Sequence, residues 1–423
     1  MPGKPSDIIV YNAKQVVTAS GFTENPAAGS EMQHLCTIED GAVAISEGKI
    51  VAVSRSNDIL ANYDTAEKID ATGKIITPGL IDAHTHFVSA GSRENELEMK
   101  IQGAKYLEIL EKGGGILRTV RDTRAASKDE LMTICRKRAN RLLQHGTTTI
   151  EAKSGYGLDL ATEIKSLEVI NQLNREGPLS LVPTFLGAHA IPTEFEGRVN
   201  EYVDLVCEEC IPRIRELNLA TFCDVFCEKG VFEIEESKKI LLAGKRHGLL
   251  PRIHADELYP LGGAELAADV GAVSADHLLY TSPGGMERMR QAGVVATLMP
   301  AAPLTLMLGR YADARKFISI GTPIALGSDL SPSCLLENYQ LVLSLACYEM
   351  KMTPAEALIA ATINAAHSIR KAAEIGSLEV GKKADLVIFD VPDYRFLGYE
   401  LGTNAADTVI KNGKVVVRGG QLE

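Results

Sequence analysis

The chain has 423 residues, of which 45% are hydrophobic and 23% are charged, and this length is sufficient for one large domain with a smaller companion. A formal net charge of −11, without any basic run, argues against a nucleic-acid-binding protein. No signal-like N-terminus or bilayer-spanning apolar run occurs, and eight cysteines in so long a chain predict no disulfide framework. We therefore expect a cytoplasmic protein that contacts no membrane.

Both ends of the chain are rich in short β-type runs. Residues 42–54 predict two strands joined by a tight turn, and Asn412-Gly413 lies between apolar runs as a strong signal for a two-residue hairpin. The segment between the two ends has a different character. We therefore predict one small β-sandwich domain assembled from residues 1–72 and 371–423.

The middle segment, residues 73–370, alternates predicted strands with predicted helices. The apolar strand-like runs lie at 75–86, 146–153, 179–189, 221–228, 250–255, 272–278, 293–299 and 323–329. Clear helical periodicity is found at 128–143, 159–174, 199–217 and 233–247. Eight such alternations predict an α/β fold with a (β/α)8 TIM-like barrel of parallel strands, and a doubly wound open sheet is the alternative.

Polar side chains follow the predicted strands at the point where each strand ends, which is where barrel enzymes hold their active sites. Five of the nine histidines of the chain lie there: His84, His86, His189, His254 and His277. Side chains alternate along a strand, so His84 and His86 share one face and can hold one metal ion. A single strand-end histidine is more often an ordinary hydrogen-bonding side chain. The set as a whole favours metal catalysis.

We predict that the metal ligands are His84, His86, His254 and Asp329, the last of which ends the eighth strand. Three neutral imidazoles and one carboxylate can hold one Zn²⁺ or Fe²⁺/Fe³⁺ per subunit and leave a position for water. A cation in this position lowers the pKa of water towards neutrality. Asp329 can also accept a proton from that water, which gives it a catalytic role besides ligation.

Two further residues fit acid–base and electrostatic roles. Glu257 lies three residues beyond His254, past the strand end, where it can reach a substrate as a proton shuttle. The alternative is that Glu257 is an acidic residue at the start of the next helix. His277 ends the sixth strand and can donate a hydrogen bond to an oxygen that becomes negative during attack.

The motif Gly79-Leu-Ile-Asp-Ala-His-Thr-His, with His254, His277 and Ser328-Asp329, resembles the amidohydrolase superfamily. Within it, nearly the whole chain resembles the imidazolonepropionase family. The most discriminating runs are residues 91–100, 106–115, 151–158, 185–190, 222–232 and 253–257. The resemblance implies metal-dependent hydrolysis of the cyclic amide 4-imidazolone-5-propanoate to N-formimidoyl-L-glutamate in histidine degradation. It also implies a homodimer.

The same resemblance implies which residues bind the small-molecule substrate. Arg93, Tyr156 and His189 match positions expected to contact it together with Glu257, and Tyr106 is a weaker candidate. The planar guanidinium of Arg93 suits the propanoate group. Without the resemblance, each side chain also has an ordinary explanation: a surface arginine, a packed aromatic or a strand-end hydrogen-bonding group.

The chain departs from the family after the eighth strand. Ser331-Pro332-Ser333 stands where the family usually has Asn-Pro-Gly. A serine hydroxyl still donates and accepts hydrogen bonds, but over a shorter reach than an asparagine amide. We expect ligand contacts at Ser331, Ser333 and Cys334. Lys153 does not match a carbamate bridge between two metals, so one metal is the simpler expectation.

Two other functions remain open from the sequence. A nucleobase deaminase of the same superfamily would share the metal ligands and the His254-to-Glu257 spacing, although Arg93 has no carboxylate to bind in such a substrate. A non-catalytic scaffold would not need the four ligands and the shuttle that this chain retains.

Overall fold

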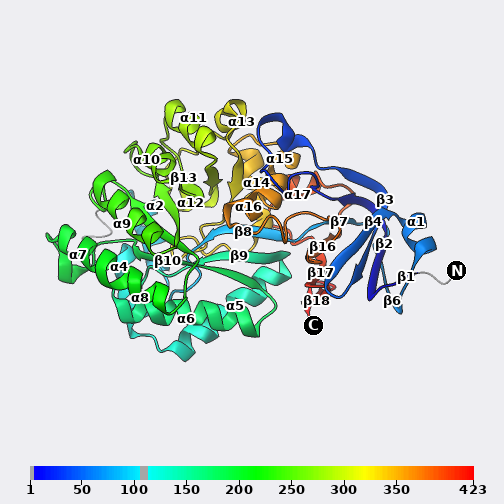
Figure 1. Cartoon of the computed structure of the whole chain (residues 1–423), viewed down its shortest axis with the longest axis horizontal. Helices are drawn as coiled ribbons and strands as arrows, with labels where there is room; N and C mark the ends of the chain where they lie inside the picture. The colour runs from blue at the N-terminus through cyan, green and yellow to red at the C-terminus, as the bar shows by residue number, and fades with distance from the viewer. Residues whose placement is uncertain (1–3, 105–112) are drawn as a thin grey trace.

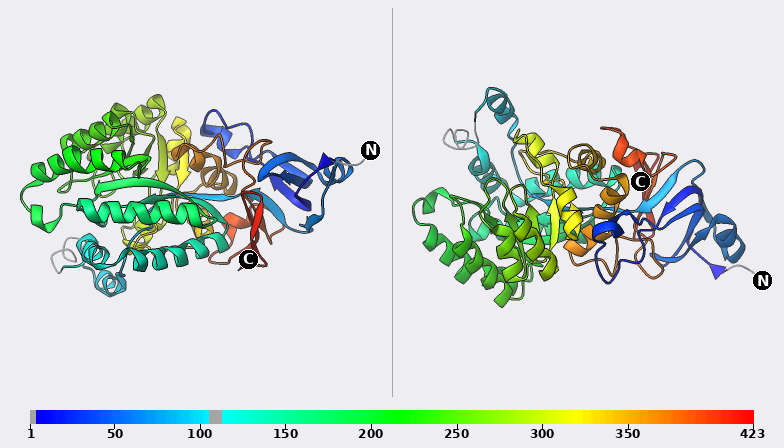
Figure 2. Two further views of the ribbon diagram at one scale, coloured as in Figure 1. Left: turned by 60° about the horizontal axis from the view of Figure 1, so that its bottom comes forward. Right: turned by 90° about the horizontal axis from the view of Figure 1, so that it is seen from above.

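The computed structural model describes residues 4–104 and 113–423. An eight-stranded parallel sheet is surrounded by helices, and a nine-stranded sheet formed by both ends of the chain lies beside it (Figure 1). The turned views in Figure 2 keep this second sheet, in blue and red, at one end of the molecule. The α/β barrel with a terminal β domain is therefore confirmed.

The barrel strands follow one another in chain order, and each pairs in parallel with its neighbours. They are β8 (Leu80–Thr85), β9 (Thr147–Lys153), β10 (Ser180–Ala188), β11 (Phe222–Cys227), β12 (Leu250–Ala255), β13 (Ser274–His277), β14 (Val295–Leu298) and β15 (Ile324–Leu326). The barrel closes where β8 meets the segment after β15. There the Asp329 amide donates to the His84 carbonyl at 3.1 Å, and the His86 amide donates to the Leu330 carbonyl at 2.8 Å. This closure brings the first and last predicted ligands together.

The apolar run at 75–86, predicted as one strand, is two strands in different sheets. β7 (Ile75–Pro78) pairs antiparallel with β16 (Leu386–Phe389) and parallel with β2 (Ile8–Val17), and β8 belongs to the barrel. Gly79 separates them, and any side chain there would collide with β9. The prediction of a single strand is wrong because both halves are apolar and buried, so hydrophobicity does not distinguish them.

Helices cover the outside of the barrel. The barrel helices are α2 (Glu94–Ile101), α4 (Gly115–Ala125), α5 (Lys128–Gln144), α6 (Leu160–Glu176), α7 (Val199–Leu205), α8 (Ile211–Glu216), α9 (Ile234–Arg246), α10 (Gly263–Val270), α11 (Pro283–Ala292), α12 (Ala301–Thr305), α13 (Ala314–Ile320), α14 (Tyr339–Tyr348), α15 (Pro354–Ala360) and α16 (Ile363–Ser368). A Ser127–Glu130 capping box starts α5, and the Asp159 side chain caps α6. The helix predicted at 199–217 contains a π-helical turn, Val206–Cys210.

The terminal sheet has the strand order β19-β18-β17-β16-β7-β2-β3-β4, and β6 also pairs with β2. The strands not yet placed are β3 (Thr37–Ser46), β4 (Lys49–Arg55), β6 (Glu67–Asp70), β17 (Ala406–Lys411), β18 (Lys414–Arg418) and β19 (Gln421–Leu422), and β1 (Lys4–Pro5) pairs separately with β5 (Tyr63–Asp64). The predicted hairpin at Asn412-Gly413 is confirmed, with φ of 49° and 74°. Strands from both ends of the chain share one core, which contains Val10, Ile76 and Leu386. The domain boundaries at 72/73 and 370/371 stay predictions.

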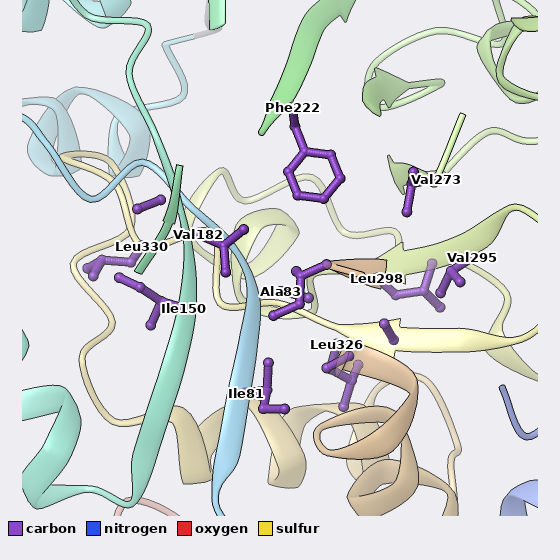
Figure 3. Packing of buried hydrophobic residues seen from close by; sticks show 14 of the residues in the cluster. Ile81, Ala83, Ile150, Val182, Phe222, Val273, Val295, Leu298, Leu326 and Leu330 are labelled. Atoms are coloured by element: carbon purple, nitrogen blue, oxygen red, sulfur yellow. The ribbon is translucent and has the colours of Figure 1, made fainter. Parts of the chain in front are cut away.

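Buried side chains of the barrel strands and of the helices that pack on them form one hydrophobic cluster. Figure 3 shows part of it, including Ile81 and Ala83 from β8, Val182 from β10 and Phe222 from β11. Burying each large side chain of this kind stabilises the fold by roughly 1.5–3 kcal/mol. Dense packing therefore holds the strand ends in fixed positions. Within the described residues, no helix has the length and apolarity needed to cross a membrane.

Candidate metal centre and substrate cavity

The four predicted metal ligands lie together at the carboxyl end of the barrel. Nε2 of His86 is 3.4 Å from Nε2 of His254 and 3.4 Å from Oδ1 of Asp329. Nε2 of His84 is 3.6 Å from the same Asp329 oxygen. Four ligands placed tetrahedrally at about 2.1 Å from a zinc ion would be about 3.4 Å apart. The spacing therefore fits a single small cation.

The protonation of this group also fits a cation. Nδ1 of His84 lies 2.7 Å from Oδ2 of Asp276, and Nδ1 of His254 lies 3.1 Å from Oδ2 of Asp224. A carboxylate accepts a hydrogen bond from Nδ1–H, which leaves the lone pair on Nε2. Burial lowers the pKa of His84 and His86 well below the usual range, so both rings are neutral.

Converging lone pairs repel one another unless something positive lies between them. Nε2 of His84 is buried and has no hydrogen-bond partner among residues 4–104 and 113–423. Sets of three side chains whose ligand atoms lie within 4.8 Å of one another recur here, including His84, His86 and Asp329. The described residues can therefore hold a metal ion.

Glu257 and His277 lie next to this centre and line the same cavity. Oε1 of Glu257 is 3.4 Å from Nδ1 of His277. Burial raises the pKa of Glu257 well above its usual range, and the negative charges of Asp329 and Glu228 add to the shift. Burial lowers the pKa of His277 to about 3, so its ring is neutral and carries one N–H donor. A carboxyl group that holds protons and a neutral imidazole are suited to proton transfer and to oxyanion stabilisation, respectively.

The alternative explanation for Glu257, capping of the next helix, does not hold. α10 begins at Gly263, and its first amides donate to the neighbouring Asp256 instead. Oδ1 of Asp256 accepts from the amides of Gly262 and Gly263, both at 2.9 Å, and Oδ2 accepts from that of Ala264 at 3.2 Å. The carboxylate of Glu257 is therefore not used for capping and lines the cavity.

The cavity has a volume of about 360 Å³ and contains the predicted substrate-binding side chains Arg93, Tyr156 and His189. Nε of Arg93 donates to Thr119 Oγ1 at 2.9 Å. Its buried Nη2 has no hydrogen-bond partner in the described part of the chain. Nδ1 of His189 lies 2.9 Å from the Gly155 carbonyl, and its ring stacks on His86 at a centroid distance of 4.6 Å. The guanidinium is thus fixed on one side and available to an anionic ligand on the other.

The residues that follow β15 form a tight turn at the cavity wall. Ser331 and Ser333 both line the cavity, and their hydroxyl oxygens are 3.1 Å apart. Cys334 is not among the lining residues that the structure describes; its thiol donates to the Ser328 carbonyl and its amide donates to the Ser331 carbonyl. A ligand contact at Cys334 stays a prediction without geometric support. Tyr106 lies outside the described residues.

Sequence reasoning missed several polar side chains of the site. Asp224 contacts His254 from the adjacent strand β11, and Asp276 of β13 contacts His84 of β8, which is not an adjacent strand. Glu96 and Lys100 of α2 line the cavity. Charged residues within apolar strand runs were a usable signal for Asp224 and Asp276. No signal distinguished Lys100 from the other charged residues of its helix.

Known proteins resemble this chain over almost its whole length. A model of the amidohydrolase family matches residues 75–419. The imidazolonepropionase of Brevibacillus brevis is 51% identical over 418 residues, which cover 98% of each chain. That of Shouchella clausii is 52% identical over 421 residues, which cover 98% of this chain and 94% of the other.

Solved structures agree on the fold. A zinc-bound adenosine deaminase from Xanthomonas campestris is 20% identical, with a TM-score of 0.73 and coverage of 100% of this chain and 95% of the other. A triazine hydrolase variant is 18% identical, with a TM-score of 0.74 and coverage of 99% and 96%. Similarity at this level of identity shows only the architecture. The family model and the curated relatives together show that the chain belongs to the imidazolonepropionase family of the amidohydrolases.

Proposed function

We propose that the described centre hydrolyses the cyclic amide 4-imidazolone-5-propanoate to N-formimidoyl-L-glutamate. Family membership makes the chain a hydrolase of histidine degradation that acts on a small molecule. The observation that carries the assignment of residues is one cavity with three features. It contains a cluster of histidines, an acid–base pair and a guanidinium nitrogen without a partner among the described residues.

One metal ion per subunit, zinc or iron, would be held by His84, His86, His254 and Asp329. When bound, it supplies Lewis acidity that lowers the pKa of a water molecule and makes it a better nucleophile. Asp276 and Asp224 keep the rings of His84 and His254 oriented with Nε2 towards the ion. Hard and borderline metals both accept three imidazoles and one carboxylate, so the donor set suits zinc and iron alike.

Proton transfer is assigned to Glu257. Its carboxylate accepts a proton as water adds to the ring carbonyl carbon, and it then delivers that proton to the ring nitrogen as the C–N bond breaks. The raised pKa supports both steps, because the proton is held firmly between acceptance and delivery. The N–H of His277 donates to the carbonyl oxygen as negative charge develops on it. Asp329 is available to assist in removing the water proton.

Substrate recognition is assigned to other side chains that line the cavity. Arg93 binds the propanoate through the guanidinium edge that Thr119 leaves free, which is a charge-assisted contact. Tyr156 and His189 flank the ring, and Ser331 and Ser333 provide hydroxyl groups beside the metal centre. Arg93 favours this substrate over a nucleobase, which has no carboxylate. The contact at Cys334 is retained only as a prediction.

Turnover measurements test this proposal. The purified protein, loaded with zinc or iron, is supplied with 4-imidazolone-5-propanoate, and formation of N-formimidoyl-L-glutamate is followed by mass spectrometry. Guanine and cytosine are assayed in parallel for ammonia release. We expect ring opening only. Ammonia release from a nucleobase, with no turnover of the imidazolone, would overturn the assignment.

Family resemblance also leads us to propose a homodimer in the cytoplasm that does not bind nucleic acid. The excess of acidic residues supports the last point. Sedimentation of the purified chain should give the mass of two subunits, and a monomer at micromolar concentration would refute the dimer.

A further inference from the structure

A cluster of five buried charges lies beneath the metal centre, and the proposed function gives a role to only two of them, Asp224 and Asp276. Its members come from four barrel strands, β9, β11, β12 and β13, and all have side chains with no exposed surface: Glu151, Lys153, Asp224, Arg252 and Asp276. Burying an ion costs several kcal/mol unless the other members of the cluster compensate for it. Three carboxylates and two cationic side chains give the cluster one net negative charge. Loss of either cation would therefore increase the unpaired negative charge that is buried there.

Lys153 is central to this cluster. Its Nζ is 3.0 Å from Oε1 of Glu151, 2.8 Å from Oδ2 of Asp224 and 3.9 Å from Oδ2 of Asp276. Arg252 has a different set of partners. Its guanidinium reaches Asp276 at 3.0 Å, but it also donates to the backbone carbonyls of Ala83 and Ser368.

Two of the carboxylates near Lys153 are the ones that contact histidine ligands. Asp224 lies 3.1 Å from Nδ1 of His254, and Asp276 lies 2.7 Å from Nδ1 of His84. Asp224 also contacts the lysine at hydrogen-bond distance, so the chain of contacts runs from Lys153 through Asp224 to the ring of His254. Arg252 does not offer Asp224 a replacement, because its ion-pair distances are to Asp276 and Glu151.

We propose that Lys153 is a positioning residue for the metal centre. It acts through Asp224 by holding that carboxylate against Nδ1 of His254, so that the lone pair of Nε2 faces the metal. This inference rests on the metal ligands of the proposed function. Without the ammonium group, three carboxylates share a single guanidinium and repel one another. Asp224 then turns away, and the proton of His254 is free to move to Nε2, where it blocks coordination.

The test measures metal binding without substrate. Zn²⁺ affinity is determined by competition with a chromophoric chelator for the full chain and for Lys153→Met. We expect the dissociation constant to rise about 10- to 100-fold, the scale found when outer partners of metal-bound histidines are removed. The matched control is Lys165→Met, since Lys165 donates to three backbone carbonyls at 2.7–3.2 Å away from the centre. The zinc affinity of Lys165→Met should equal that of the original chain.

A second measurement separates positioning from general destabilisation. The ¹⁵N chemical shifts of labelled histidines in the metal-free protein report which ring nitrogen carries the proton. In Lys153→Met we expect His254 to gain the Nε2–H form. His86, which makes no hydrogen bond to Asp224 in the part of the chain that the structure describes, should keep its form. An unchanged His254 tautomer together with unchanged zinc affinity would overturn the proposal.

Asp224→Asn provides an independent route if Lys153→Met does not fold. This variant removes the same link while keeping the lysine, so it should lose zinc affinity to a similar extent; an affinity equal to that of the original chain would also overturn the proposal. Where both single variants fold, the double variant Lys153→Met/Asp224→Asn should bind zinc about as tightly as the weaker-binding single variant. The reason is that both changes break the same chain of contacts, so their effects should not add. Fully additive losses would contradict it. Failure of the original chain itself to bind zinc would instead refute the metal assignment.

Discussion

Replacing Glu257 by glutamine tests the assigned proton transfer with little change in shape. The amide occupies the same volume but can no longer accept a proton. Glu257 lies in the cavity, 3.4 Å from His277, and the capping contacts of α10 belong to Asp256, so removal of the charge has no structural cost through that helix. Losing a positioned acid–base group lowers the rate about 10²- to 10⁴-fold. We expect kcat for ring opening to fall by that factor.

The pH dependence of kcat/KM also tests whether Glu257 transfers the proton. Burial, with the charges of Asp329 and Glu228, raises the pKa of Glu257. Only the ionised form accepts a proton, so kcat/KM should decline as the pH falls through this raised value. The decline should therefore begin above pH 4.5, the ordinary value for this side chain. Glu257→Gln should lose this acidic limb.

The assay follows substrate loss across pH, with metal content measured on the same samples. Metal content should remain at the original level, because Glu257 is not an assigned ligand. Glu265→Gln is the control, since Glu265 accepts a hydrogen bond from Ser282 and does not line the described cavity. Turnover by Glu257→Gln within about threefold of the original chain would refute the role, because a loss that small is below the range for acid–base help.

Three further substitutions have separate readouts. Arg93→Met should raise KM about 10- to 100-fold with a smaller change in kcat, because a charge-assisted contact worth roughly 1.5–3 kcal/mol is lost; an unchanged KM would contradict the propanoate assignment. Glu163→Gln should raise KM about tenfold, because the carboxylate accepts hydrogen bonds from three backbone amides of the loop that carries Tyr156. KM is measured by varying the substrate concentration, and an unaltered KM would contradict the idea that Glu163 positions this loop for substrate binding. Lys411→Met breaks a buried pair with Asp385 and should lower the free energy of unfolding by about 3–5 kcal/mol without altering kcat/KM, as measured by denaturant unfolding and turnover; a loss below ~1 kcal/mol would contradict this reasoning.

The candidate site was largely predictable because a parallel barrel gathers strand ends that are distant in the sequence. Each assigned ligand is a polar residue at the end of an apolar run, so recognising eight runs was enough to place His84, His254 and Asp329 together. Turn chemistry was equally local, and Asn412-Gly413 forms the expected hairpin.

Other features depend on pairing between strands, which a single sequence does not record. The contact of Asp224 with His254 joins β11 to β12, and nothing in either run specifies it. The division of 75–86 at Gly79 depends on which sheet each half meets, since both halves are equally apolar. Cys334 follows a tight turn whose hydrogen bonds direct its amide to Ser331 rather than to the cavity, and residue order alone did not reveal this.

Anomalous diffraction from crystals grown with zinc tests the central claim most directly, since it locates the ion independently of activity. We expect one peak per subunit, within about 2.0–2.2 Å of Nε2 of His84, His86 and His254 and of a carboxylate oxygen of Asp329. A peak held instead by His189, or the absence of any peak at this end of the barrel in zinc-saturated crystals, would contradict the account.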